Sequence, residues 1–124
     1  MGNSKFNITK EAKDIIDSIK VILEIDDTPS IIKLALAKGI ATCDPSAAIE
    51  KVNGDGYWLV PENIIRDKDY LLFKHLIINE YQTVISDQEI NKYFAFLIEK
   101  GARELQHREQ NKTSFEDIYV AILT

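Results

Sequence analysis

The sequence predicts a mainly α-helical protein that begins with one short strand and two helices and continues into a further helical part. Apolar residues alternate between Lys5 and Thr9, they recur at helical spacing along most of the later chain, and residues typical of helix starts separate these runs. With 124 residues, 45% of them hydrophobic, the chain is long enough to bury one core. We therefore expect a single domain over residues 1–124, with a strand-helix-helix element at 5–40 and a helical part at 67–124 packing on it.

The predicted strand has two distinct faces. Phe6 and Ile8 lie on one face, whereas Lys5, Asn7 and Thr9 lie on the other, which is the alternation of a half-buried strand. We expect the apolar face to point toward the core.

The first predicted helix begins after Thr9, whose hydroxyl can cap it. Apolar residues then recur at three- and four-residue steps, and most lysines and aspartates fall on the opposite, solvated face. The apolar residues are Ala12, Ile15, Ile16, Ile19, Ile22 and Leu23.

The second predicted helix begins at Thr28-Pro29. Thr28 is a suitable N-cap, and proline suits the first helical position because its missing N–H would have no partner there. The following residues 31–37 are apolar almost all round, which favours burial on more than one side. We expect this helix to end or bend near Gly39.

This order of elements is typical of a ribbon-helix-helix module, so the fold class predicted is mainly α with a ribbon-helix-helix-like N-terminal part. In such modules two chains pair their strands into a ribbon that enters the DNA major groove, while the start of the second helix faces a phosphate. On this interpretation Lys5, Asn7 and Thr9 face DNA, and Thr28 and Ser30 lie at the phosphate. The alternative is that the apolar face of the strand only tethers an N-terminal segment to a helical core.

The net charge of the chain argues for weak DNA contact. Fifteen Lys and Arg stand against 20 Asp and Glu, a formal net charge of −5, whereas DNA-binding domains usually carry a basic excess. Locally, Lys5, Lys10 and Lys13 outnumber the single acid Glu11 and form a small basic patch. Any DNA affinity should therefore be modest, dependent on oligomers and sensitive to salt.

The centre of the chain contains turns and one short strand. A brief helical segment is possible at 47–52, and residues 53–56 form a tight turn. Residues 57–60 then predict a strand that Pro61 stops. The turn lacks the glycine spacing of a phosphate-binding loop.

The last part of the chain is predicted to be helical from Asp67 onward, with a first helix at 67–81. A capping box at 86–89 precedes a further helix in which Gly101 marks a bend. The polar stretch 103–112 predicts a frayed end or a loop. A second capping box at 113–116 begins a short final helix.

No motif for catalysis, a metal or a cofactor is evident, so we expect none of the three. The two histidines, His75 and His107, lack ligand or nucleophile spacing, and Cys43, the single cysteine, excludes an internal disulfide. Carboxylates such as Asp67 and Asp69 offer the alternative of a Mg²⁺-dependent nuclease. No segment is apolar enough to span a bilayer and no signal peptide is evident, so we expect a cytoplasmic protein.

Taken together, the two halves resemble the DNA sulfur modification protein family DndE. The resemblance covers roughly residues 5 to 106 and rests on the order and spacing of several short motifs. These are Phe6 to Ala12, Thr28-Pro29, Asp55-Gly56, Asp69 to Phe73, Glu89-Ile90, and Leu97 to Gly101.

The resemblance implies a helical homo-oligomer, a dimer or a tetramer, that serves in the bacterial machinery replacing a non-bridging phosphate oxygen of DNA by sulfur. It also implies DNA binding, nicked duplex in particular, through surface lysines. The residues to test as phosphate contacts are Lys5, Lys10, Lys13 and Lys33. Two alternatives stay open: an assembly adaptor of the same or a related defence system without DNA contact, and a DNA-nicking nuclease.

Overall fold

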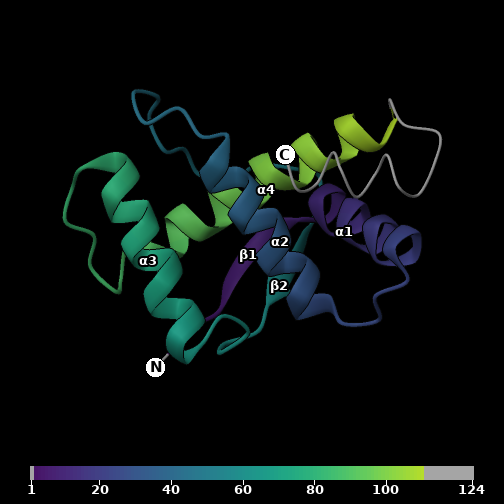
Figure 1. Cartoon of the computed structure of the whole chain (residues 1–124), viewed down its shortest axis with the longest axis horizontal. Helices are drawn as coiled ribbons and strands as arrows, with labels where there is room; N and C mark the ends of the chain where they lie inside the picture. The colour runs from purple at the N-terminus through teal and green to yellow at the C-terminus, as the bar shows by residue number, and fades with distance from the viewer. Residues whose placement is uncertain (1, 111–124) are drawn as a thin grey trace.

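The computed structural model describes residues 2–110, with side chains placed as far as His107. The protein is mainly helical, and a short N-terminal strand is followed by two helices and then by further helices, as the sequence predicts (Figure 1). The elements are β1 (Phe6–Thr9), α1 (Lys10–Leu23), α2 (Thr28–Ala41), β2 (Tyr57–Val60), α3 (Asp67–Tyr81) and α4 (Ile90–Gln110).

The centre of the fold is the crossing of α2 and α4, which two glycines make close. A Cβ atom on Gly101 would lie 1.7 Å from the carbonyl oxygen of Ala35, and one on Gly39 would lie 2.0 Å from that of Leu97. Only a residue without a side chain permits such an approach of two backbones. α2 continues past Gly39 to Ala41, and α4 continues through Gly101, so neither glycine ends its helix. Both glycines instead allow the close crossing of the two helices.

The other elements surround this crossing. In Figure 1, α1 lies on one side of α2 and α4 and α3 lies on the other, while β1 and β2 pass beneath them. α3 reaches the core through Tyr70, whose ring packs edge-on against Phe94 of α4 with centroids 6.0 Å apart. The apolar face of α1 is buried as predicted, except that Ile22 is only half buried.

The ribbon forms within one chain. β1 pairs antiparallel with β2, in the register Phe6 with Val60 and Asn7 with Leu59. A ribbon-helix-helix module pairs strands from two chains, whereas here the chain supplies its own second strand. The predicted strand at 57–60 is confirmed, and pairing with β1 is its role.

Asn3 fixes the chain ahead of β1. This residue is buried, and its side-chain amide donates a hydrogen bond to the carbonyl of Pro61 (3.0 Å) and accepts one from the backbone N–H of Ile65 (2.9 Å). Its own backbone N–H donates to the carbonyl of Ile65 (3.0 Å). The segment between β2 and α3 is thereby tied to the N-terminal end of the ribbon.

Three local predictions need correction. The segment 47–52 contains no helix, because it runs as an irregular connection between α2 and β2. The stretch from 103 to 110 is the continuation of α4, where the buried Leu105 supplies an apolar contact that outweighs the polar composition. The N-cap of α2 is Asp27, since Thr28 is already helical. The predicted final helix from 113 lies outside the described residues.

No helix within the described residues is long and apolar enough to cross a membrane.

Candidate nucleic-acid interface

The outward face of the ribbon exposes part of the predicted contact set. Asn7 of β1 and Lys5, the residue just before β1, are both exposed. Tyr57 and Leu59 of β2 lie on the same face, with 48% and 49% of their surface exposed. A face with one cation, one amide and two half-exposed apolar side chains suits contact with a macromolecule better than contact with water alone.

Thr9 does not belong to this face, which corrects the expectation that it meets DNA. Its side chain is buried, where its hydroxyl accepts the backbone N–H of Ala12 (3.1 Å) and contacts both carboxylate oxygens of Glu99, at 2.7 and 2.9 Å. The cap of α1 is thus confirmed. The same hydroxyl supplies the hydrogen bond that a buried carboxylate needs.

The two lysines at the start of α1 differ in whether their ammonium groups are already engaged within the chain. Lys10 is exposed and has no ion-pair partner within the described part of the chain. Lys13 is engaged: its ammonium pairs with Asp17 at 2.6 Å and lies 4.8 Å from the centre of the Trp58 ring. Because only 17% of the Lys13 side chain is exposed, contact with a phosphate would require both interactions to be given up.

The start of α2 is also occupied by contacts within the chain. Lys20 donates to the Thr28 hydroxyl (2.8 Å), and the Ser30 hydroxyl donates to the carboxylate of Asp27. Lys33 pairs with Asp69 of α3 at 2.8 Å. The Asp27 carboxylate lies at the N-terminus of the helix, the position that would otherwise attract a phosphate.

The structure therefore divides the predicted contact residues into two groups. Three are exposed and unpaired in the described part of the chain: Lys5, Asn7 and Lys10. The others are engaged in side-chain contacts within the chain: Lys13, Thr28, Ser30 and Lys33.

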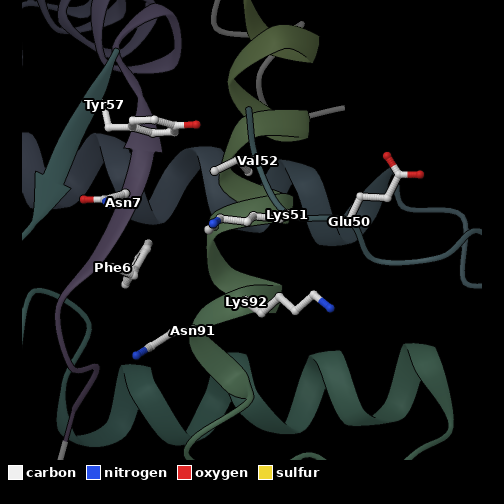
Figure 2. A pocket seen from close by; sticks show the side chains of 9 residues that line it. Phe6, Asn7, Glu50, Lys51, Val52, Tyr57, Asn91 and Lys92 are labelled. Carbon is white, nitrogen blue, oxygen red and sulfur yellow. The ribbon is translucent and has the colours of Figure 1, made fainter. Parts of the chain in front are cut away.

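A pocket of about 520 Å³ opens beside β1 (Figure 2). Its apolar part comes from Phe6, Val52 and Ala95, and Tyr57 lies at its edge. The segment between α2 and β2 forms the wall opposite β1. Figure 2 shows the Lys51 ammonium directed from that wall toward β1.

The α4 side of the pocket is polar. Asn91 donates from its amide nitrogen to the Ser4 hydroxyl, while its amide oxygen is buried and has no donor among the described residues. Lys92 follows on the rim and is exposed. Neither Lys92 nor Lys51 has an ion-pair partner in the described part of the chain.

The backbone of β1 has one open edge. Because the N–H of Lys10 bonds the carbonyl of Gly56 (2.9 Å), the residues bonded to β2 within the ladder are Phe6 and Ile8. The backbone N–H and C=O of Asn7, between them, consequently point away from β2. Asn7 also lines the pocket, so its peptide groups face that open space.

Sequence reasoning missed Lys51, Asn91 and Lys92. Lys51 lies in a segment that carries no periodic signal, and the two α4 residues are ordinary polar positions of a helix. Their meeting with β1 depends on long-range packing, so no local pattern could have revealed it.

Other residues considered from the sequence lie apart from this region. His75 is exposed on α3. Cys43 follows α2, where partial burial and then the charge of Glu80 raise the pKa of its thiol. Burial and the neighbouring Cys43 thiol also raise the pKa of Tyr81 to about 12. A raised thiol pKa leaves little reactive thiolate at neutral pH.

Among the described residues, no group of three or more His, Cys, Asp or Glu side chains is placed to hold a metal ion. Comparisons with protein-family models, with curated proteins and with solved structures find no match. The resemblance to the DndE family therefore stays a hypothesis drawn from the motifs.

Proposed function

We propose that this protein is a DNA-binding accessory subunit of a bacterial DNA phosphorothioation complex, and that it contacts the phosphate backbone through β1 and the start of α1. One observation carries the DNA contact: Lys5 and Lys10 are exposed, and no carboxylate within the described residues neutralises either of them. The pathway comes from the resemblance of the motifs to the DndE family.

The chemistry of these side chains suits phosphate contact and gives little base readout. A lysine ammonium is a point charge that holds a phosphate without reporting the sequence, and the exposed amide of Asn7 adds hydrogen bonds to the backbone. With a net charge of −5 the single chain binds weakly. A dimer or tetramer would repeat the patch along one duplex and raise the affinity through multivalency.

The test is DNA binding measured by fluorescence anisotropy across a salt series, with intact and nicked duplexes of the same sequence. Lys5→Ala and Lys10→Ala should each weaken binding and reduce the slope of log K against log salt by about 0.9, the value for one lost phosphate contact. Lys68→Ala is the matched control, since Lys68 is an exposed lysine that belongs to α3 and not to β1 or α1.

The nicked duplex is expected to bind more tightly than the intact one. Absence of binding even at low salt, or salt slopes that are the same in all three variants, would exclude this role.

A second candidate, an assembly adaptor without DNA contact, is favoured by the outer surface of α3. Leu71, Leu72 and Leu76 leave 42%, 54% and 40% of their surface exposed. An apolar surface of this kind often lies in a protein interface. If the adaptor role is correct, Leu72→Glu will abolish self-association in sedimentation velocity while the parent protein fails to bind either duplex.

A further inference from the structure

We propose that the open edge of β1 and the Lys51 ammonium form a docking groove for an extended acidic peptide of a partner protein, which adds to β1 as a third strand. The inference does not depend on DNA contact, because it uses the backbone of Asn7 rather than its side chain, and a different cation, Lys51. It assigns a role to the pocket of Figure 2.

The backbone of Asn7 supplies the hydrogen bonds for such a strand. Its N–H and C=O point away from β2 and into the pocket, and an unpaired strand edge is the usual site for strand addition. An added strand would lie roughly 4.8 Å from β1. That position is in the space between β1 and the segment 50–52.

The side chains around the pocket select the kind of peptide. Lys51 points toward β1 and has no ion-pair partner in the described part of the chain, whereas Glu50 and Lys92 are directed away from β1 (Figure 2). An unpaired cation directed into the groove favours an acidic ligand. Phe6 and Ala95 provide apolar surface in the pocket for the alternate side chains of the peptide.

A peptide fits this groove better than a second copy of the chain does. The β1 strand of another copy carries β2 on its other edge, and that second strand would occupy the place of segment 50–52, the far wall of the pocket. Pairing two copies would also bring Lys5 of one copy toward the lysines of the other. A single extended segment meets neither obstacle.

The experiment uses fluorescein-labelled hexapeptides in which Asp or Glu alternates with Val, Ile or Leu, and it measures their binding to the full chain by anisotropy. We expect saturable binding by the acidic set and none by a matched set with Lys in place of the acids. Methylating the peptide nitrogens of alternate residues on one edge of the bound strand should weaken binding at least tenfold. That control leaves the protein unchanged.

Two variants test the protein side. Asn7→Pro removes the N–H that faces the groove but no bond to β2, and proline is tolerated on an open edge. Lys51→Glu reverses the charge of the wall. Both should weaken peptide binding at least tenfold, while Lys68→Glu on α3 stays within twofold of the parent protein, and thermal unfolding by circular dichroism reports whether each variant is folded.

Three outcomes would overturn the proposal. The first is that no acidic hexapeptide binds, or that Lys51→Glu binds as well as the parent protein. The second is a dimer of the parent protein that becomes monomeric in Asn7→Pro, which would assign the edge to a second copy. The third is displacement of the peptide by single-stranded oligothymidine with the same dependence on Lys51. Loss of duplex binding alone in Lys5→Ala leaves the proposal intact.

Discussion

Replacing Gly101 by alanine tests the closeness of the α2–α4 crossing on which the whole fold depends. The new Cβ would lie 1.7 Å from the carbonyl oxygen of Ala35 and 2.7 Å from the backbone nitrogen of Gly39. Carbon and oxygen atoms need roughly 3.4 Å, so the helices would have to separate by well over 1 Å. Both clashing atoms belong to backbone, and no rotamer change can relieve them.

The cost can be worked out from opposing terms. Alanine favours an exposed helix by about 1 kcal/mol over glycine. Overpacking costs about 1–3 kcal/mol, and more where the backbone must move. If the helices separate by about 1 Å, the side chains that face the gap also lose up to half of their dispersion energy. Leu36, Leu97 and Ile98 are fully buried at or near this crossing. We therefore expect a net loss of about 2–4 kcal/mol in the free energy of unfolding.

Urea unfolding followed by circular dichroism measures this loss directly. The matched control is Gly56→Ala, because a Cβ there meets only the side chain of Lys10 at 3.8 Å, an ordinary contact. That variant should lie within about 0.5 kcal/mol of the parent protein. If Gly101→Ala is as stable as Gly56→Ala, the two helices do not cross as closely as described and the reasoning fails.

Three further predictions concern other parts of the fold. Thr9→Val should lower the free energy of unfolding by about 2 kcal/mol or more in urea, because it removes the cap of α1 and leaves the buried Glu99 carboxylate without its hydroxyl donor; an unchanged stability would contradict both roles. The Cys43 thiol should react several-fold more slowly with a disulfide reagent at neutral pH in the folded protein than in urea, since burial raises its pKa; equal rates would refute this. Hydrogen bonds from Lys74 and Tyr70 lower the pKa of the Asp87 carboxyl, so its contribution to stability is present above the pKa of the unfolded chain and is lost as the pH falls through the lowered pKa of the folded protein. Asp87→Asn should accordingly be less stable than the parent at neutral pH and equally stable well below pH 4, as measured by thermal melts; a difference that persists in acid would exclude the ionic cause.

Much of the secondary structure was predictable because its causes are local. The alternation around Phe6 and Ile8 and the Thr9 cap act over a few residues, and the structure confirms the strand and the helix that follows it. The apolar spacing of 67–81 likewise predicts α3 with its observed bounds. The helical stretch after 103 escaped prediction, since its polar composition hides the buried contact of Leu105.

The candidate interface was predictable only in part. Which lysines are present near β1 follows from the sequence, but which of them are free depends on partners elsewhere in the chain. Asp69 lies far from Lys33 in sequence, and Trp58 far from Lys13, yet each engages that lysine in space. No local pattern reports a partner of this kind.

By itself the sequence determined the helical class, the order of the elements and the amphipathic faces, because periodicity and capping operate within one or two turns of backbone. The tertiary structure alone decided that β1 pairs with its own β2, that Gly39 and Gly101 let two helices touch, and that Thr9 turns inward to Glu99. The physical reason is the range of the interactions. Thr9 and Glu99 are 90 positions apart, and only packing of the whole core brings such residues within hydrogen-bonding distance.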